Sequence, residues 1–386
     1  MPYAQGDMKE LNRREVFDLL SRRGEASRVE IHRALGISTP TVLKIISFLS
    51  ERHIITAAGE EKTVRGRPPC RFRFDPDSIL SVGVSYDGRE ALAVVANYRG
   101  EVKQSAAEPA GPDFDALMAD VLPRLLPRLL SGLAPELGPV CGVGICLPGS
   151  VDTGEARVLL GPLANIRMRR PSAESAQSLS AALGLPVYLF NDANAAATGE
   201  YLLRRLHGDD LIYISAGEGI GAGIILDGKL RTGKRFSTGE IAHMVFDPDF
   251  MTDIQKPGWF EAQLSEASLH EKFPGDPYGA EAVHYVARHL ALVVANLCNT
   301  LDVGTFILGG SLTGRLGGAL MDETVEYVER LCLLPATLDA PCCANPALPG
   351  AAFMAAQREL DGMLADGAED ATPCRARKEA DYEIYG

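Results

Sequence analysis

Apolar residues recur at helical spacing near the start of the chain and predict two short helices there. The stretch 12–22 gathers its apolar side chains on one face, and Gly24 follows it as a stop signal. Ser27 then precedes a second helical stretch, with Glu30 three residues later as in a capping box. The expected buried positions are Val16, Phe17, Leu19 and Leu20 in the first helix, and Val29, Ile31 and Leu35 in the second.

A third helix is predicted directly after the turn at Gly36, with Ser38 or Thr39 as its cap and Pro40 in its first turn. Its expected buried positions are Val42, Leu43, Ile45, Ile46 and Leu49. Two short helices joined in this way form a helix-turn-helix, whose second helix enters the major groove with its N-terminal residues against the bases. The candidate DNA contacts are Ser38, Thr39, Thr41 and Lys44. A helical hairpin that serves only as core is the alternative.

Two extended stretches after the third helix predict the hairpin of a winged helix. Residues 54–56 begin it, and residues 71–74 alternate polar and apolar side chains as a strand does. Between them lie Arg65, Gly66 and Arg67, followed by two prolines that keep the segment extended. We expect the two arginines to enter an A·T-rich minor groove. A basic linker between domains is the alternative, and both interpretations can hold at once.

From residue 79 onward, strand-like and helix-like stretches alternate, as they do in α/β folds. The strand-like stretches are 82–84, 91–96, 140–147, 187–190, 211–215 and 306–308. The first two are joined by a turn at Asp87-Gly88, and a helix is expected over 351–364. Residues 366–386 are polar and charged and are expected to form a loosely ordered tail.

Two polar residues end one of these strands, at the place where α/β sheets bind small molecules. The run 187–190 is followed by Asn191 and Asp192 and then by an alanine-rich helix. An amide beside a carboxylate can donate to and accept from sugar hydroxyls, and the carboxylate could act as a general base. The same pair could instead only cap the helix. These two residues alone do not decide between the interpretations.

Charge is divided unevenly along the chain. Residues 1–78 hold 14 Lys and Arg against 11 Asp and Glu, whereas the remaining residues hold 24 against 40. Because the acidic remainder would repel nucleic acid, any DNA contact is expected in the first 78 residues.

The overall composition is that of a globular protein of the cytoplasm. The chain has 386 residues, of which 46% are hydrophobic and 23% charged, with no apolar run long enough to span a bilayer and no signal-peptide pattern at its start. The eight cysteines are scattered and form no disulfide-like framework, so most are expected to be buried thiols. No membrane partner is expected.

The landmarks of the second part, in their order behind a winged helix, resemble the ROK family of repressors, open reading frames and sugar kinases. The matching motifs are Leu147-Pro148-Gly149 with Val151-Asp152, Asn191-Asp192-Ala193-Asn194-Ala195-Ala196, Gly239-Glu240-Ile241-Ala242-His243 and Leu308-Gly309-Gly310. The resemblance covers nearly the whole chain, because many ROK repressors also carry an N-terminal winged helix. It implies a two-lobed, actin-like ATPase fold.

The resemblance also implies a sugar site. The family holds its sugar with an Asn-Asp pair, the Glu and His of a Gly-Glu-Ile-Gly-His motif, and a further Glu. Carried over by position, these are Asn191, Asp192, Glu240, His243 and Glu261, and Asn165 lies in a loop that approaches the sugar in relatives. A core histidine at His243 and a surface helix residue at Glu261 are the structural alternatives.

The phosphate-binding motifs of the family are degenerate in this chain. The Asp-x-Gly-Gly-Thr signature of ROK kinases corresponds to Ser85, Tyr86, Asp87, Gly88 and Arg89, so the first Asp and the Thr are lost. The second phosphate loop, normally Gly-Thr-Gly, is Gly217, Glu218 and Gly219. A carboxylate there would repel a triphosphate, and phosphoryl transfer depends on positioning and charge neutralisation. ATP and Mg²⁺ are therefore not expected as cofactors, and no residue is assigned a catalytic role.

The zinc site of the family is also missing from the sequence. The family presents Cys-x-Cys-Gly-x-x-Gly-Cys after the histidine, whereas residues 244–260 contain no cysteine. Trp259 stands where a cysteine would be, and a hydrophobic plug is expected to hold this loop in place of a metal. No metal is expected.

The expected fold class is α/β, with an N-terminal winged helix-turn-helix followed by a two-lobed actin-like ATPase fold of the ROK sugar-kinase type. The expected domains are 1–78 for the DNA-binding domain with its Gly-Arg-Pro wing, 79–194 for the small lobe with a returning helix at 350–365, 195–349 for the large lobe, and 366–386 for a flexible tail.

The leading hypothesis is a sugar-responsive repressor that binds operator DNA as a homodimer or a dimer of dimers and binds a sugar or sugar derivative without phosphorylating it. The first alternative is an ATP-dependent sugar kinase with an added DNA-binding domain, in which Asp192 is the base and the loop 217–223 cradles phosphate. A constitutive DNA-binding protein with a vestigial pocket is the second alternative.

Overall fold

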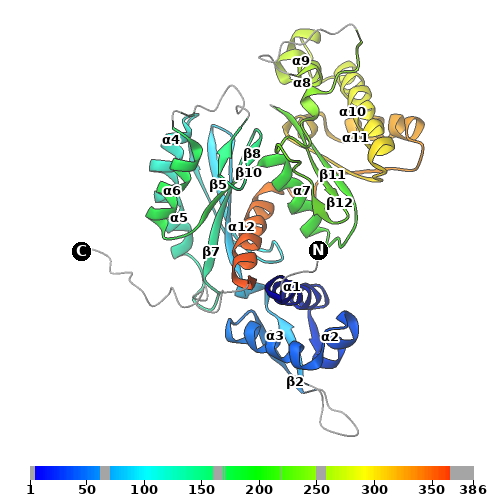
Figure 1. Cartoon of the computed structure of the whole chain (residues 1–386). Coiled ribbons are helices and arrows are strands. Elements are labelled where there is room, and N and C mark those ends of the chain that lie inside the picture. The colour runs from blue at the N-terminus through cyan, green and yellow to red at the C-terminus, as the bar shows by residue number, and fades with distance from the viewer. Residues whose placement is uncertain are drawn as a thin grey trace.

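In the computed structural model, the N-terminal part of the chain folds as a winged helix-turn-helix (Figure 1). Its elements are α1 (Gln5–Arg23), β1 (Glu25–Ser27), α2 (Arg28–Leu35), α3 (Thr39–Glu51), β2 (Ile55–Glu60), β3 (Cys70–Phe74) and the 3-10 turn η1 (Pro76–Ser78). The structure describes residues 5–60, 70–159, 168, 170–217, 219–248 and 258–365.

Cap residues set the ends of these helices as the sequence predicted. The Ser27 hydroxyl accepts from the Glu30 backbone N–H, and the Glu30 carboxylate accepts from the Ser27 N–H at 2.7 Å, so the capping box is confirmed. Gly36 ends α2 in the left-handed conformation with φ of 69°, and Ser38 caps α3. α1 starts at Gln5, earlier than predicted, because its first turns expose their apolar side chains and so give no periodic signal.

Two apolar residues that the pattern placed in the core lie at the surface. Val29 is 49% exposed and Leu43 is 37% exposed. The buried residues of α3 are Val42, Ile45, Ile46, Phe48 and Leu49. Because a helix turns about 100° per residue, Leu43 points away from the face that its neighbour Val42 buries. The short helix α2 buries only Ile31 among its own side chains. The prediction was wrong at both positions.

The predicted wing hairpin is confirmed, and a third strand completes its sheet. β2 and β3 pair antiparallel, and β1 pairs with the other edge of β3, which gives the order β1-β3-β2. Arg71 on β3 forms ion pairs with Glu25 at 3.1 Å and with Glu30 at 3.3 Å. The wing is therefore held against the N-terminal end of α2.

The first lobe contains a five-stranded sheet with helices on its outer face. Its elements are β4 (Leu80–Tyr86), β5 (Glu90–Asn97), β6 (Val102–Pro109), α4 (Phe114–Ala116), the π-helical turn η2 (Leu117–Val121), α5 (Leu122–Ser131), β7 (Val140–Leu147), β8 (Val151–Asp152), β9 (Arg157–Val158), α6 (Ser172–Leu183) and β10 (Val187–Asn191). One hydrophobic core joins the sheet to α4, η2, α5 and α6.

The second lobe contains another five-stranded sheet and the two longest described helices, α10 and α11. Its elements are α7 (Asp192–Leu203), β11 (Leu211–Ala216), β12 (Ile220–Leu226), β13 (Lys229–Leu230), the 3-10 turn η3 (Ile241–His243), α8 (Trp259–Leu264), α9 (Glu266–Lys272), α10 (Ala280–Leu301), β14 (Thr305–Gly309), α11 (Ser311–Leu331) and β15 (Thr337–Asp339). The last helix of the described chain is α12 (Ala347–Leu364).

The two sheets have the same topology. The first has the order β6-β5-β4-β7-β10 and the second the order β13-β12-β11-β14-β15. In each, three antiparallel strands are extended by two parallel ones. This repeated unit in two lobes is the actin-like arrangement, so the predicted fold class is confirmed.

Helices α7 and α12 lie between the two lobes, packed closely through glycines. A Cβ at Gly199 on α7 would come 1.9 Å from the Pro346 carbonyl oxygen, and one at Gly350 on α12 would come 1.8 Å from that of Ala195. α12 also crosses the first sheet, where Gly144 leaves no room for a side chain beside the backbone of Ala351. α12 thus packs against β4 and β7 of the first sheet as well as against α7.

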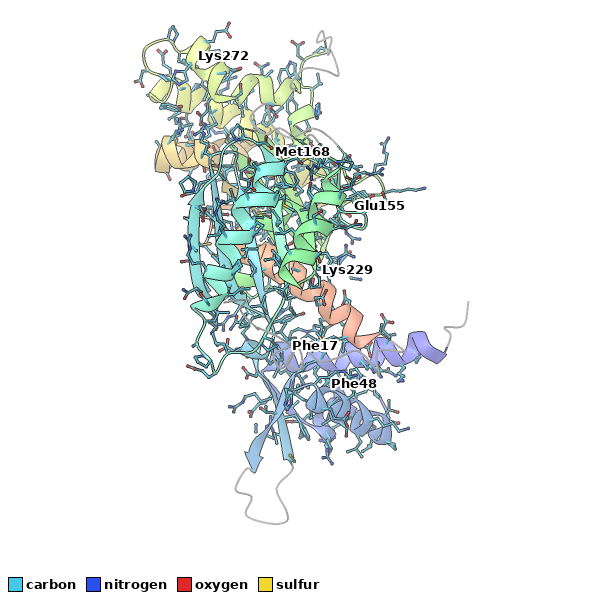
Figure 2. The ribbon with its side chains drawn as sticks, turned by 90° about the vertical axis from the view of Figure 1, so that its left-hand side faces the viewer. Phe17, Phe48, Glu155, Met168, Lys229 and Lys272 are labelled. Atoms are coloured by element: carbon cyan, nitrogen blue, oxygen red, sulfur yellow. The ribbon has the colours of Figure 1, made fainter. Side chains whose placement is uncertain are left out.

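The C-terminal half of α12 shares a core with the winged helix. Ala356, Leu360 and Leu364 belong to the same buried cluster as the apolar residues of α1 and α3. Phe17 on α1 packs edge-on against Phe74 and Tyr98, with ring centroids 5.2 and 5.3 Å apart. Figure 2 shows Phe17 at this junction, with Phe48 further into the winged helix. The winged helix is thus packed onto α12 and the first sheet.

Within the described residues, no helix combines the length and the apolar character needed to cross a membrane.

Candidate functional site

Asn191 and Asp192 lie where β10 ends and α7 begins. The Asn191 Oδ1 atom accepts from the Asn194 backbone N–H at 2.8 Å, so the capping interpretation is correct for this residue. Its Nδ2 atom donates to the Gly149 carbonyl at 3.0 Å and lies 3.3 Å from Asp192 Oδ1. The Asp192 Oδ1 atom also accepts from the Ala193 N–H at 2.8 Å. These bonds fix the orientation of both side chains.

Asp192 is a carboxyl group with a strongly shifted pKa. Burial raises the pKa of Asp192 to about 6, and the nearby Glu240 carboxylate also raises it. The backbone N–H groups that bond to Asp192 lower its pKa and partly oppose these effects. A carboxyl group shifted by burial beside another carboxylate is typical of binding and catalytic sites.

Glu240, His243 and Glu261 lie close enough to one another for their charges to interact. Burial raises the pKa of Glu240, and His243 opposes that shift. Burial also raises the pKa of Glu261, whose carboxylate accepts a hydrogen bond from the Ile220 backbone and is affected by both His243 and Glu240. His243 is exposed, so it is not a core histidine, and Glu261 lies partly buried on α8. Four of the predicted sugar-binding residues thus form one electrostatic group: Asp192, Glu240, His243 and Glu261.

A loop of the first lobe connects this group to the second lobe. Gly149, which receives the Asn191 hydrogen bond, has φ of 101°, a conformation that favours glycine. The next residue, Ser150, is buried, and its hydroxyl donates to the Phe236 carbonyl of the second lobe. Sequence reasoning did not identify Ser150, whose only signal was its place directly after the Leu-Pro-Gly motif. Asn165, the sixth predicted sugar residue, lies outside the described residues.

The turn predicted to be the degenerate first phosphate loop is stabilised by hydrogen bonds from its own backbone to the Asp87 carboxylate. Asp87 Oδ1 accepts from the backbone N–H groups of Arg89 at 2.8 Å and Glu90 at 3.0 Å, around Gly88 with φ of 85°. The Ser85 hydroxyl hydrogen bonds with the buried Cys146 thiol. Position 85 offers a hydroxyl where the kinases have a carboxylate, and Asp87 is already engaged. That this turn does not hold a magnesium-bound nucleotide stays a prediction.

The second predicted phosphate loop lies at the carboxyl end of β11. The Gly217 N–H donates to the Gly219 carbonyl at 3.0 Å, and a Cβ at Gly217 would lie 2.7 Å from the Ser311 hydroxyl at the start of α11. The loops after β11 and β14 therefore meet at the carboxyl ends of two parallel strands. Glu218 lies outside the described residues, so its repulsion of a triphosphate stays a prediction.

Aromatic contacts hold the described part of the segment that lacks the zinc cysteines. Trp259 packs edge-on against Phe246 with ring centroids 5.7 Å apart, and its ring lies 6.4 Å from that of His289. Phe246 also contacts Phe260, at 5.9 Å. These contacts agree with a hydrophobic plug at Trp259. Among the described residues, which omit 249–257, no three His, Cys, Asp or Glu side chains are grouped as metal ligands.

The predicted DNA contacts of the helix-turn-helix lie at the surface of α3. Ser38, Thr39 and Lys44 are exposed, and Thr41 is partly exposed. The hydroxyls of Ser38 and Thr41 are 2.8 Å apart, and Ser38 also accepts from the Thr41 backbone N–H. The predicted minor-groove residues lie outside the described part of the chain: Arg65, Gly66 and Arg67. Contact with DNA by either set stays a prediction.

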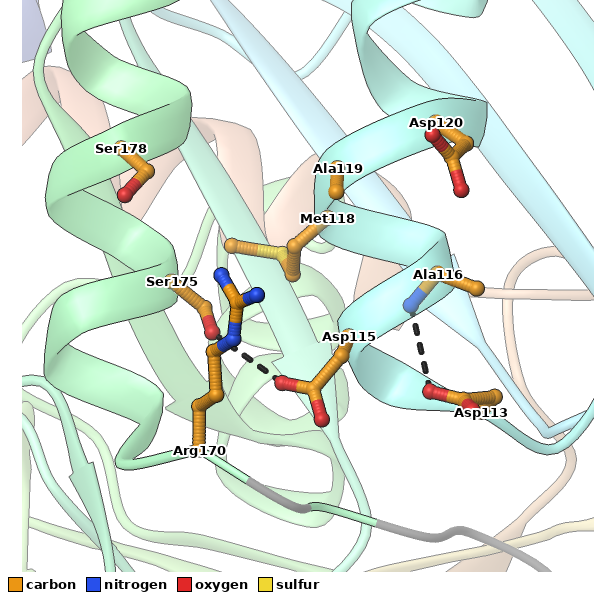
Figure 3. Close-up of a pocket in the computed structure, with 9 residues that line it drawn as sticks. All are labelled: Asp113, Asp115, Ala116, Met118, Ala119, Asp120, Arg170, Ser175 and Ser178. Carbon is orange, nitrogen blue, oxygen red and sulfur yellow. Dashed lines mark hydrogen bonds between the residues drawn. The ribbon is translucent and has the colours of Figure 1, made fainter.

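A cavity of about 410 Å³ lies away from both candidate sites, between η2 and α6 of the first lobe (Figure 3). Its polar lining consists of Asp113, Asp115, Asp120, Arg170, Ser175 and Ser178. The Ser175 hydroxyl donates to Asp115 across 3.4 Å. None of the described sugar-site residues lines this cavity, so it is not the predicted sugar site.

Comparison with known proteins places the fold and the sequence in one family. Residues 83–332 match the sequence model of the ROK family. The xylose repressor of Caldicellulosiruptor bescii is 28% identical over 271 residues, which are 68% of this chain and 65% of that repressor. A solved ROK family transcriptional regulator, a homologue of the E. coli MLC protein, has a TM-score of 0.76 at 22% identity, covers 92% of this chain and 98% of its own, and shows the shared fold.

A kinase of the same family is also similar. The ROK family glucokinase from Streptomyces griseus, solved with glucose and AMPPNP, has a TM-score of 0.59 at 26% identity. That likeness covers 72% of this chain and 99% of the glucokinase.

Proposed function

We propose that this chain, which belongs to the ROK family, is a transcriptional repressor whose two-lobed part binds a sugar or sugar derivative without phosphorylating it. The observation that carries this proposal is the placement of α12. Its N-terminal half packs against α7, which begins at Asp192, and its C-terminal half lies in the core of the winged helix. One helix therefore touches both the helix that begins at Asp192 and the domain that would bind DNA.

The sugar site in this proposal consists of Asn191, Asp192, Glu240, His243 and Glu261, to which family resemblance adds Asn165. Carboxylates, an amide and an imidazole can each bond hydroxyls that both donate and accept. A sugar that lacks one of those hydroxyls would leave a buried polar group unpaired, so discrimination among sugars should be strong. Burial raises the pKa of Asp192, Glu240 and Glu261, and the Glu240 carboxylate adds to the shift at the other two. Because three carboxyl groups meet here, we expect a neutral ligand rather than an anionic one.

Regulation follows from a shift between conformations of the two lobes. The Asn191–Gly149 bond and the Ser150–Phe236 bond join the sugar residues to loops of both lobes. A ligand that prefers one arrangement of the lobes changes the population of that arrangement. Because α12 is packed in the winged helix, such a shift would move the DNA-binding domain. In a homodimer on two half-sites, this changes the spacing or orientation of the two recognition helices.

The proposal assigns no catalytic activity. Phosphoryl transfer needs a placed nucleotide and neutralised charge. The hydrogen bonds from the turn backbone to Asp87 support the proposal that this turn provides neither. A coupled assay of ADP release with a panel of sugars tests this point. We expect no turnover above the rate without protein, and steady turnover with any sugar would favour the kinase alternative.

The regulatory proposal is tested with the full chain. Duplexes retained from a randomised pool define a binding sequence, and fluorescence anisotropy gives Kd with and without each sugar of a panel that includes xylose and glucose. We expect at least one sugar both to stabilise the protein, by about 2.7 kcal/mol at 100 times its Kd, and to weaken DNA binding. A sugar that binds but leaves Kd for DNA unchanged would contradict the proposal.

A further inference from the structure

The exposed face of α3 contains one large apolar side chain that the core does not use. Leu43 is 37% exposed, whereas the other large apolar residues of this helix, from Val42 to Leu49, are at most 9% exposed. Its neighbours one turn away on the same face are Thr39 and Ser47, both exposed, and Lys44 follows it. Leu43 therefore lies in the middle of the surface that includes the predicted DNA contacts.

The position of Leu43 along α3 suits contact with bases. The helix is capped by Ser38, so Leu43 lies in its second turn, next to the N-terminal residues that a recognition helix presents to the major groove. Single exposed leucines are ordinary elsewhere on a protein. On this face, however, docking of the helix would bury the leucine side chain against DNA. If that side chain met only polar base edges, it would displace the water bonded to the bases and offer no hydrogen bond in its place.

The major groove presents one apolar group, the C5 methyl of thymine. We propose that Leu43 reads sequence by packing against a thymine methyl in each half-site. This inference rests on the proposed DNA-binding function and adds a specificity-determining residue to it. The hydroxyls of Thr39 and Ser47 and the ammonium of Lys44 would supply the polar contacts around this apolar one.

The experiment removes the thymine methyl group and the Leu43 side chain separately. The full chain first selects duplexes from a randomised pool. Each thymine of the selected site is then replaced, one position at a time, by deoxyuridine, which lacks only the C5 methyl. Kd is measured at one salt concentration for the wild type, for Leu43→Ala and for Leu11→Ala, a control at a 43% exposed leucine on α1. Thermal unfolding of each variant confirms that the fold is retained.

We expect one thymine per half-site at which deoxyuridine weakens binding by the wild type and by Leu11→Ala about fourfold, the value of one buried methyl group at ~0.8 kcal/mol. Leu43→Ala should bind the thymine and deoxyuridine duplexes equally. The inference is overturned if every deoxyuridine affects wild type and Leu43→Ala alike. If the protein selects no duplex, the proposed function fails and the inference fails with it. If it selects DNA without a Leu43-dependent thymine, only the inference fails.

Discussion

Arg13 donates from its Nη1 atom to the Leu364 carbonyl at 3.0 Å and thereby joins the first described helix to the last. The same atom donates to the Ala365 carbonyl, also at 3.0 Å, and the guanidinium stacks 3.8 Å from the ring centre of Phe48. Arg13 is buried, at 3% exposure. A cation at the C-terminal end of a helix bonds the carbonyls that have no partner within the helix. Arg13 thus caps α12 from inside the winged helix.

Removal of this cap should loosen the winged helix from α12. In Arg13→Met the two carbonyls lose a charged donor, and we expect the unfolding free energy to fall by about 1.5–3 kcal/mol. Arg22→Met, at an exposed position of α1, should change it by less than about 0.5 kcal/mol. Urea unfolding of the three proteins measures the difference. Equal stability of wild type and Arg13→Met would show that the two segments are not coupled through this residue.

The close contact of α7 and α12 predicts opposite effects of alanine at two glycines of one helix. Gly350→Ala would place a Cβ 1.8 Å from the Ala195 carbonyl oxygen, so the two helices must separate, at a cost of about 1–3 kcal/mol or more. Gly362→Ala, where no atom lies within 4 Å of the added Cβ, should instead stabilise by about 0.4–1 kcal/mol. Thermal unfolding distinguishes them. Equal effects from the two substitutions would mean that the helices do not pack as described.

The raised pKa of Asp192 predicts how stability depends on pH. Because the pKa of this carboxyl is about 6 in the folded protein and lower in the unfolded chain, its contribution is most favourable below about pH 4 and is lost as pH rises through 6. Because asparagine does not ionise, Asp192→Asn does not lose stability in this way as pH rises. It should therefore be more stable than wild type at pH 8, with a smaller difference at pH 5. It should also bind sugar poorly.

Urea unfolding at the two pH values, with the exposed Asp322→Asn as a control, measures this dependence. If Asp192→Asn and wild type differ by the same amount at pH 5 and pH 8, the Asp192 carboxyl is not shifted as described.

Lys44 should contribute to recognition of the selected sequence more than to general attraction for DNA. A lysine that contacts a base provides about 1–3 kcal/mol of discrimination, so Lys44→Ala should weaken the selected duplex at least fivefold more than an unrelated one. Lys229→Ala, at an exposed position of the second lobe, should leave both unchanged. Anisotropy titrations at fixed salt test this. Equal weakening of both duplexes would place Lys44 on a phosphate instead.

The sequence predicted the local structure of the winged helix well, because caps and turns act over a few residues. Ser27 with Glu30, Gly36 and Ser38 each have the expected role. Apolar periodicity was less reliable at Val29 and Leu43, since in short helices a shift of one position turns a side chain from core to solvent. The periodicity also could not show where α1 begins, because Met8 and Leu11 in its early turns are exposed.

Contacts between segments far apart in the chain could not be predicted from the local sequence pattern. The residue types of the sugar site could be carried over by family resemblance, and four of them do lie together. Nothing near Arg13 in the sequence indicates that it bonds residues about 350 positions away, nor does the Ser150 hydroxyl signal its bond to Phe236. Such contacts depend on how the two lobes and the winged helix pack, and so they require the three-dimensional structure.

The central claim is that sugar controls DNA binding without chemistry. The most direct test titrates a binding sugar into the preformed complex of the full chain with its selected duplex, with no nucleotide present, and follows anisotropy. Mass spectrometry then identifies the recovered sugar. The account predicts release of the duplex, with about a 5–150-fold rise in Kd, and recovery of the unmodified sugar. Release that requires MgATP, with the sugar recovered as its phosphate, would contradict it.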